Sequence, residues 1–353
     1  MGNTTTVTEF ILVGFPNSLE VKIVFFVVFL FVYLVTVLAN TLIIVLVYVD
    51  CTLHSPMYYF LSNFSFIEIS TTSTVVPKML ANVLSEKKTI SFAGCFSQLY
   101  FYFSLVAAEF ILFAIMSYDR YVAICHPLRY PTIMTGRVCN QLVLSAWVGG
   151  LVTILPSVVL RARLPYCGPN VIDHYFCDSM PLLHLACTDV WFVELNDLVV
   201  SLVLLLGSLA LTAASYIWII STILRIPSNQ GRQKASATCA SHFVVVCLGF
   251  GIAIFIYLRP SQMNSVHLNK ILSVLSSIVT PLLNPFIFSL RNEQMKEALK
   301  HTLCKLLGMA KQMGKPRVSS WPAGSHSQKN LRRNFLFKSL CFSDRLLESI
   351  SCF

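Results

Sequence analysis

The stretch that decides the fold is Met-Ser-Tyr-Asp-Arg-Tyr-Val-Ala-Ile-Cys, residues 116–125, which ends a long apolar segment. Ionised side chains at membrane depth are costly and usually have a function. The Asp119–Arg120 pair stands where the apolar sequence gives way to His-Pro-Leu-Arg at 126–129, so we expect it at the water boundary of a membrane-spanning helix. The plainer alternative is an ion pair that only anchors this helix at the interface.

The composition around this stretch indicates an integral membrane protein. Of the 353 residues, 56% are hydrophobic and 12% are charged, and the mean hydropathy is +0.70. A soluble domain has about 25% charged residues, so this chain has too few charges to cover a water-facing surface. Most of the chain must therefore face lipid or other helices.

The net charge of +10 is concentrated near the C-terminus, where nine basic and two acidic residues lie from Lys305 onward. Basic segments beside a membrane are attracted to its anionic surface. We therefore expect membrane lipid as a partner of this segment and no nucleic acid.

Seven stretches are long and apolar enough to span a membrane, for which a helix needs about 20 mostly apolar residues. The stretches are 23–49, 57–84, 95–124, 138–160, 198–224, 237–258 and 268–290. The predicted fold is therefore an all-α membrane protein, a seven-transmembrane helix bundle. Prolines remove backbone donors inside three of these helices and predict local breaks in their hydrogen bonding. They are Pro77, Pro156, Pro281 and Pro285.

The segments outside the spans differ from one another. Residues 1–22 form a polar leader that lacks the basic start of a cleavable signal peptide, and Asn3-Thr4-Thr5 is a glycosylation sequon that predicts an extracellular leader. Residues 291–307 indicate a short amphipathic helix on the cytoplasmic membrane surface, in which Cys304 is either palmitoylated or free. Residues 308–353 are polar and basic, which predicts a disordered cytoplasmic tail.

The orientation is predicted from the connections between spans. Lys and Arg favour an extracellular N-terminus only weakly, because without the tail the inner side holds nine and the outer side eight. The sequon at Asn3 and the acidic connection between the fourth and fifth spans favour the same orientation. We therefore expect a multi-pass plasma-membrane protein with its C-terminus in the cytoplasm.

Four of the twelve cysteines lie on the predicted outer side, namely Cys95, Cys167, Cys177 and Cys187. Cysteines outside the cell tend to form disulfides, and four of them allow three connectivities. A zinc site is the alternative, but these spacings are not those of metal ligands.

Glu68 and Glu109 stand near the middle of the second and third spans. A carboxyl group at that depth must face the protein interior and be paired, be protonated or hold a cation. A general acid/base pair of an enzyme is disfavoured because no nucleophile or phosphate-binding loop accompanies the two acids. An ion path through a transporter or channel is disfavoured because the last three spans have no charge in their interiors. The sequence therefore predicts a protein that is not an enzyme.

Several strings together resemble one family. Residues 116–125 resemble the Asp-Arg-Tyr signature of rhodopsin-type G-protein-coupled receptors, and the longer string resembles that of olfactory receptors. Further similar strings lie in the same order along residues 1–305. They are Leu53-His54-Ser55-Pro56-Met57-Tyr58, Ser215-Tyr216, Lys234-Ala235-Ser236-Ala237-Thr238-Cys239-Ala240-Ser241-His242 and Pro281-Leu282-Leu283-Asn284-Pro285-Phe286-Ile287-Phe288.

This resemblance selects among the open alternatives. His174-Tyr175-Phe176-Cys177-Asp178 is similar to a family element whose cysteine pairs with the third helix. The match implies the disulfides Cys95–Cys177 and Cys167–Cys187. The string that contains Glu68 resembles one that holds Asp in the family, where that acid belongs to a sodium and water network. The match implies that Glu68 and Glu109 share either a bound sodium ion or a proton.

The resemblance also implies a function: an odorant receptor that binds a small volatile ligand and activates a stimulatory G protein of the olfactory type, which raises cyclic AMP. The residues implied in activation and coupling are Asp119, Arg120, Tyr121, Tyr216, Lys234, Asn284 and Pro285. The residues implied to line a mostly apolar ligand pocket are Tyr102, Phe103, Val106, Ala107, Phe110, Ser201, Leu204, Ala253, Ile254 and Tyr257.

Two aromatic residues depart from the family pattern. Phe288 replaces a tyrosine whose hydroxyl, in the family, joins the hydrogen bonds of the activated state with Tyr216. Phe250 stands where many olfactory receptors have tyrosine. We expect the loss at position 288 to lower constitutive activity or signalling efficiency.

Overall fold

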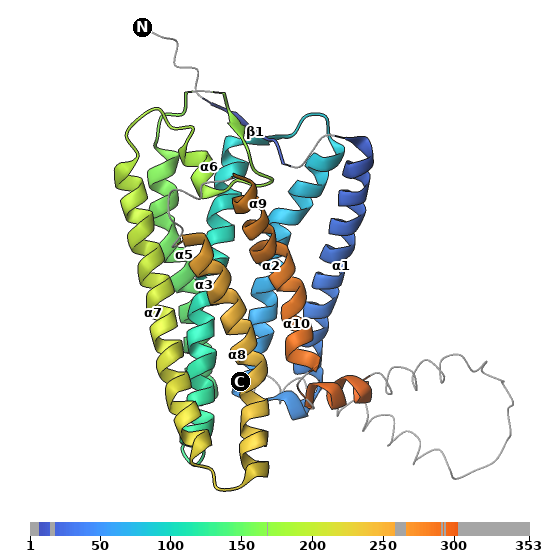
Figure 1. Ribbon diagram of the computed structural model, residues 1–353, viewed down its shortest axis with the longest axis vertical. Coiled ribbons are helices and arrows are strands. Elements are labelled where there is room, and N and C mark those ends of the chain that lie inside the picture. The colour runs from blue at the N-terminus through green and yellow to red at the C-terminus, as the bar shows by residue number, and fades with distance from the viewer. Residues whose placement is uncertain are drawn as a thin grey trace, which may run out of the picture.

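The computed structural model describes residues 7–14, 18–167, 169–257, 266–290, 292 and 294–302. Its long helices lie side by side in one elongated bundle, and a small sheet covers one end of it (Figure 1). We call this the sheet end. The opposite end carries the short helix α4 (Tyr130–Ile133) and is called the α4 end.

The bundle consists of helices that correspond to the seven predicted spans. They are α1 (Leu19–Val49), α2 (Pro56–Leu84), α3 (Phe92–Cys125), α5 (Gly136–Ala162), α7 (Trp191–Leu224), α8 (Asn229–Tyr257) and a last helix made of α9 (Val266–Val274), η3 (Leu275–Val279) and α10 (Thr280–Leu290). Short helices η1 (Cys51–Leu53) and α6 (Ser179–Leu183) lie in connections. The predicted all-α, seven-helix membrane fold is confirmed.

The helix ends differ from the predicted bounds mainly in the second half of the chain. Helix α7 begins at Trp191 rather than near 198, and α8 begins at Asn229 rather than near 237. Glu194 and Asp197, which the sequence analysis placed in an acidic outer connection, are therefore helical residues of α7. Polar residues continue a helix past the apolar core when its backbone hydrogen bonds remain satisfied internally.

Six of the described helices are long and apolar enough to span a membrane by length and composition. Helix α2 has the length but a lower hydropathy, because Ser65, Glu68, Thr71 and Thr72 lie within it, and all four are buried. It contacts α1, α3 and α5. Its polar side chains thus face other helices, where hydrogen-bond partners replace the apolar character that lipid would require.

Two prolines of the last helix leave carbonyl groups without their usual helical donors, because proline has no backbone N–H. The carbonyl four residues before Pro285 belongs to Pro281 and accepts a hydrogen bond from Asn40 Nδ2 at 3.2 Å. The carbonyl four residues before Pro281 belongs to Ser277, within the π-helical turn η3. Thr72 Oγ1 donates to the Glu68 carbonyl at 2.8 Å and lies 3.5 Å from the Ser277 carbonyl. Polar side chains from α1 and α2 therefore lie at the breaks that the sequence predicts.

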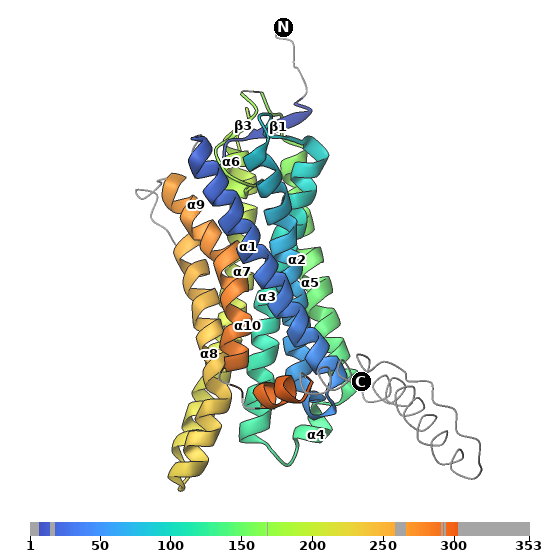
Figure 2. The same cartoon turned by 90° about the vertical axis from the view of Figure 1, so that its right-hand side faces the viewer.

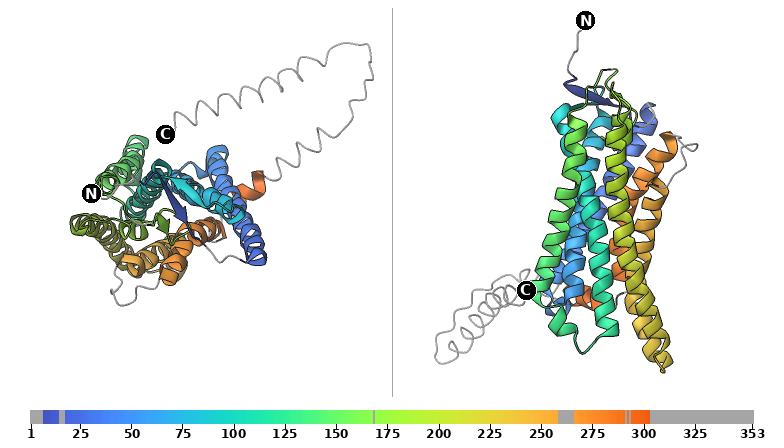
Figure 3. Two further views of the ribbon diagram at one scale, coloured as in Figure 1. Left: turned by 90° about the horizontal axis from the view of Figure 1, so that it is seen from above. Right: turned by 90° about the vertical axis from the view of Figure 1, so that its left-hand side faces the viewer.

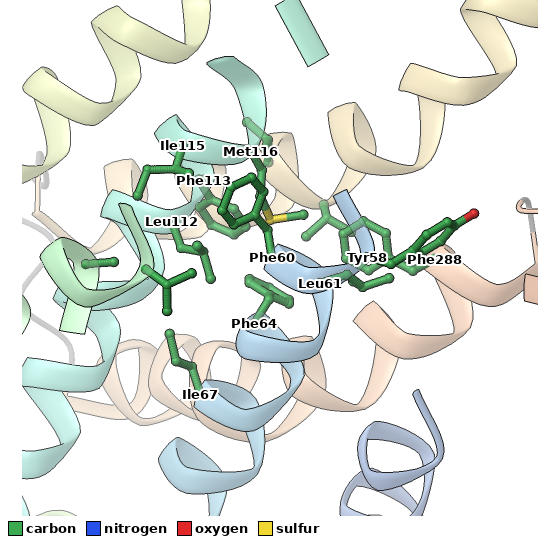
Figure 4. Packing of buried hydrophobic residues seen from close by; sticks show 14 of the residues in the cluster. Tyr58, Phe60, Leu61, Phe64, Ile67, Leu112, Phe113, Ile115, Met116 and Phe288 are labelled. Atoms are coloured by element: carbon green, nitrogen blue, oxygen red, sulfur yellow. The ribbon is translucent and has the colours of Figure 1, made fainter. Parts of the chain in front are cut away.

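The main apolar cluster lies where α2, α3 and α10 meet. Figure 4 shows its members from α2 and α3 pointing toward one another, with Phe288 of α10 at one side. Phe64 packs against Phe113 with ring centroids 5.4 Å apart and against Phe288 at 5.9 Å. Phe113 and Phe60 are fully buried. The α3 helix also contacts α5, α7 and α8, so it lies toward the centre of the bundle when seen from above (Figure 3).

The leader contributes a strand that the sequence analysis did not predict. Strand β1 (Glu9–Leu12) pairs antiparallel with β2 (Thr89–Ser91) and parallel with β3 (Val171–Ile172), in the order β2-β1-β3. Phe10 and Leu12 are buried, and Phe10 packs edge-on against Tyr166 at 5.7 Å. The leader therefore joins two connections that are far apart in sequence.

A helix at 294–302 follows the last span and lies across the α4 end (Figure 2). Its residues Met295 and Ala298 are buried against the main apolar cluster. Tyr58 of α2 donates to Asn292 Oδ1 at 3.0 Å and to Gln294 Oε1 at 2.8 Å. The described part of the predicted amphipathic segment 291–307 is thus helical, while Cys304 and the tail 308–353 lie outside the described residues.

Candidate functional site

The Asp119–Arg120 pair is buried at the α4 end of α3. Arg120 Nε donates to Asp119 Oδ2 at 3.0 Å, and a second guanidinium nitrogen contacts the same oxygen. Tyr130 of α4 donates its hydroxyl to Asp119 Oδ1 at 2.8 Å. Burial and the neighbouring Asp119 carboxylate raise the pKa of Tyr130 above its ordinary value, which keeps its hydroxyl a donor. The pair therefore ties α3 to α4 as well as neutralising its own charges.

A second polar contact at the same end joins α7 to α8. The hydroxyl of Tyr216 is 2.6 Å from His242 Nδ1, and both side chains are buried. Arg120 lies within electrostatic range of both groups. Tyr216 also belongs to an apolar cluster with Cys239, against which Tyr121 of α3 packs. Helices α3, α7 and α8 therefore meet around Arg120.

The two membrane-depth acids lie within electrostatic range of each other, between α2 and α3. Glu68 is 1% exposed and accepts a hydrogen bond from Asn284 Nδ2 of α10, whereas Glu109 is half-buried. The other amide atom, Asn284 Oδ1, is buried without a hydrogen-bond partner in the described structure, as is Ser65 Oγ one turn from Glu68. Two carboxylates and two unpaired oxygen acceptors suit a hard cation, which prefers oxygen ligands.

The disulfides at the sheet end are Cys95–Cys177 and Cys167–Cys187, the pairs that the resemblance implied. The four thiolates that a zinc site would need are therefore not available. Gln98 of α3 reinforces the first bond, because its Oε1 accepts from the Cys177 backbone N–H at 3.0 Å and its Nε2 donates to the Thr74 carbonyl at 2.9 Å. These contacts fix the connection between α5 and α7 over the end of the bundle.

The residues predicted to line a ligand pocket come together from α3, α7 and α8 in two neighbouring layers. Val106, Phe110, Ala253 and Ile254 belong to or pack against the main apolar cluster, where the ring centroids of Phe110 and Phe250 are 5.2 Å apart. The layer nearer the sheet end contains or contacts Phe103, Ala107 and Leu204. Between this lining and the loop, the Tyr102 ring packs against Phe103 at 5.1 Å and against Phe176 at 4.9 Å.

Ser201 of α7 is half-buried and adds a hydroxyl near this level of the bundle. Three predicted residues lie outside what the structure describes: Asn3 altogether, and Lys234 and Tyr257 in their side chains, although both belong to α8. Their assigned roles remain predictions.

Sequence reasoning missed a charged contact at the sheet end. Arg161 of α5 is 2% exposed and binds Asp197 of α7 through both carboxylate oxygens, with an Nη1–Oδ1 distance of 2.9 Å. It also contacts Ser179 Oγ of α6. The only available signal was a basic residue just after one apolar run and an acid just before the next one, and both were assigned to loops.

His242 was a second residue that the sequence analysis did not single out, although it ends the string 234–242. Only the fold places it opposite Tyr216, because the two residues belong to different helices.

Comparison with known proteins gives consistent matches across this bundle. A family model described as Olfactory receptor matches residues 29–306. The human protein Olfactory receptor 6S1 is 52% identical over 301 residues, which cover 85% of this chain and 91% of that protein. Human Olfactory receptor 6J1 is 50% identical, covering 88% of this chain and 89% of its own. Mouse Olfactory receptor 6E1 is 48% identical, and the match covers 86% of this chain and 98% of that protein.

Proposed function

The chain belongs to the olfactory receptor family and is a multi-pass membrane odorant receptor rather than an enzyme, and we propose that it binds a small, mostly apolar volatile molecule and activates a stimulatory, olfactory-type G protein. The partner then exchanges its nucleotide, and cyclic AMP rises. The observation that carries this proposal is the buried Asp119–Arg120 pair at the end of α3, surrounded by residues from α4, α7 and α8.

The ligand class follows from the lining of α3, α7 and α8. Phe103, Val106, Phe110 and Leu204 offer apolar surface, whose burial contributes about 25 cal/mol per Å² to affinity. Ser201 and the Tyr102 hydroxyl give a few polar contacts that would fix orientation. A small molecule with one or two polar atoms suits such a lining better than a charged one.

The proposed orientation places the sheet end outside the cell. Asn3 then carries its glycan in the extracellular space, and the two disulfides lie in the oxidising compartment that favours them. The α4 end and the C-terminus face the cytoplasm, where the G protein would bind.

Activation is proposed to be a population shift, in which the ligand stabilises a state with α8 displaced from α3. In the present state, Asp119 holds Arg120 and Tyr216 contacts His242. Displacement of α8 separates His242 from Tyr216 and frees Arg120 to contact the G protein. Asn284 and Pro285 would act as the flexible point of the last helix, since Pro285 removes a backbone hydrogen bond there and Asn40 donates to the freed Pro281 carbonyl, while Glu68 accepts from the Asn284 side chain.

We also propose that a sodium ion binds between Glu68 and Glu109. Asn284 Oδ1 and Ser65 Oγ, buried without partners, would complete its oxygen ligands. The ion would offset the repulsion between two neighbouring carboxylates. By holding α2, α3 and α10 together, it would favour the state in which Arg120 is bound to Asp119.

The test is a cyclic AMP assay in cells that express the chain with an olfactory G protein, screened against a broad panel of volatile organic molecules. A saturable response that Arg120→Ala abolishes while surface expression persists is the expected result. Arg137→Ala is the matched control, because this arginine is exposed at the start of α5. Loss of the response in both variants would show a general charge effect and contradict the assigned role of Arg120.

The ligand site has its own matched pair of variants. Leu204→Ala removes apolar surface from the proposed lining, whereas Leu206→Ala removes the same atoms from a side chain that is 48% exposed on α7. The first variant should raise the half-maximal ligand concentration by about tenfold, and the second should leave it unchanged. Equal effects would place the ligand elsewhere.

A further inference from the structure

A small cavity lies at the sheet end, beside the apolar cluster in which Met79 and Tyr175 join Tyr102. Its volume is about 20 Å³, enough for one water molecule or a compact polar group. It is bounded by the end of β1, the first turns of α1, the last turns of α2 and the loop residue Tyr175. The lining residues are Leu12, Val13, Gly14, Lys22, Phe25, Met79, Asn82, Val83, Lys88 and Tyr175.

Two lysines and no acids belong to this lining. Lys22 comes from α1, and among the described residues no carboxylate pairs with its ammonium group. Lys88 follows α2 and donates to the Val13 carbonyl at 3.1 Å. Partial burial, and then the charge of Lys22, lower the pKa of Lys88 below its ordinary value. The two charges therefore disfavour each other, and an anion between them would relieve this repulsion.

A buried amide gives an independent observation at the same place. Asn82 of α2 lines the cavity and is 6% exposed, and its Nδ2 has no acceptor in the described structure. A buried donor without an acceptor destabilises the folded state. An acceptor oxygen in the cavity would remove this cost, and an oxyanion supplies several.

The surroundings of the cavity suit an apolar chain attached to that oxyanion. Phe25, Met79 and Val83 form its apolar wall. On α1, the side chains of Leu19 and Ile23 beside Lys22 are exposed by 72% and 53%. A hydrocarbon chain that leaves the cavity along α1 would bury this apolar surface, while its charged head stays near the water boundary.

We propose that the cavity between β1, α1 and α2 is an anion site that takes the carboxylate or phosphate head group of an amphiphile, held by Lys22, Lys88 and the Asn82 amide. Its lining shares no residue with the predicted odorant lining of α3, α7 and α8, although Met79 and Tyr175 belong to the same apolar cluster as Tyr102. By joining the leader strand to α1 and α2, the bound molecule stabilises the sheet end.

The test uses the full chain, purified in nanodiscs of phosphatidylcholine, and a photoreactive dodecanoate with a diazirine on its terminal carbon. Cross-linked peptides are identified by mass spectrometry. Saturable labelling of the first turns of α1 is expected, and unlabelled dodecanoate should compete with it. Dodecanol, which has the same chain without the charge, should compete at least tenfold more weakly, as expected when a charge-assisted hydrogen bond is lost.

Variants connect the labelling to the named side chains. Lys22→Gln and Lys88→Gln should each raise the half-saturating concentration by about tenfold or more, while Lys22→Arg preserves it. Lys87→Gln is the matched control, because Lys87 is exposed, adjacent in sequence and outside the cavity. Unchanged melting temperatures of the variants would show that the protein remains folded.

Two results would overturn the proposal: competition by dodecanol equal to that by dodecanoate, or equal weakening by Lys87→Gln and Lys22→Gln. Inorganic phosphate and a nanodisc containing phosphatidic acid distinguish the sources of the anion. Competition by inorganic phosphate at the same concentration as dodecanoate would assign the site to free anions. Competition by phosphatidic acid alone would assign it to a lipid head group.

Discussion

The close packing of α3 and α5 at Gly150 is expected to make Gly150→Ala destabilising. Helices α3 and α5 pack along each other (Figure 1). Gly150 of α5 faces the backbone of α3. A Cβ atom at this position would be 2.4 Å from the Ser104 carbonyl oxygen and 2.8 Å from the Ala108 nitrogen. Both neighbours are backbone atoms, so neither can move out of the way by a change of rotamer.

The size of the effect follows from this geometry. Ordinary contacts of a Cβ atom lie at 3.4–4 Å, so the two helices must separate by about 1 Å. Overpacking of a closely packed interior costs about 1–3 kcal/mol, and the better helix propensity of alanine offsets up to about 1 kcal/mol. We expect a net loss of about 1–2 kcal/mol, which corresponds to a fall in melting temperature of about 2–6 °C for a chain of this size.

The assay is the thermal unfolding of the purified receptor in nanodiscs, measured together with surface expression in cells. Gly207→Ala in α7 is the control, because a Cβ atom there meets nothing within 4 Å. This variant should unfold at the wild-type temperature or above it. A Gly150→Ala receptor as stable as the Gly207→Ala receptor would refute the argument that α3 and α5 depend on a glycine at their contact.

Three further predictions concern other parts of the chain. Arg161→Met leaves the Asp197 carboxylate without its partner and should lower the free energy of unfolding by about 2 kcal/mol or more, as measured by thermal unfolding. A double variant that combines Arg161→Met with Asp197→Asn should recover part of this loss. Burial lowers the pKa of His174 below its ordinary 6.5, so the unfolded chain binds more protons than the folded chain and stability should fall as pH drops below about 6.5. His174→Phe should flatten this dependence of the melting temperature on pH. Phe288→Tyr should raise cyclic AMP output at equal surface expression, whereas an unchanged output would contradict the expected role of the missing hydroxyl.

The arrangement of the helices was predictable because long apolar runs have few other solutions in a membrane. The apolar run that ends near Arg120 predicted a spanning helix. The prolines at 281 and 285 predicted the places where backbone hydrogen bonds of the last helix are missing. The structure adds which groups lie at those breaks. Asn40, which donates to the Pro281 carbonyl, and Thr72, 3.5 Å from the Ser277 carbonyl, come from helices far away in sequence, and no local pattern connects them to the last helix.

The parts that the sequence did not predict depend on contacts between distant segments. Strand β1 is short, and it forms by pairing with β2 and β3, which lie far away in the sequence. Arg161 and Asp197 were read as loop charges because helix ends were set by hydropathy alone. A pair of opposite charges in successive helices, each next to an apolar run, is a signal that the helices continue and meet.

Helix α2 shows why hydropathy and structure diverge at the centre of the bundle. Glu68 accepts from the Asn284 side chain, and Thr72, whose hydroxyl donates to the Glu68 carbonyl at 2.8 Å, lies 3.5 Å from the Ser277 carbonyl. An apolar residue at position 68 would make α2 a more typical membrane span, but it would leave the Asn284 amide of the last helix without its acceptor in a medium without water. The low hydropathy of α2 therefore reflects its polar contacts with the last helix, and the two helices must be interpreted together.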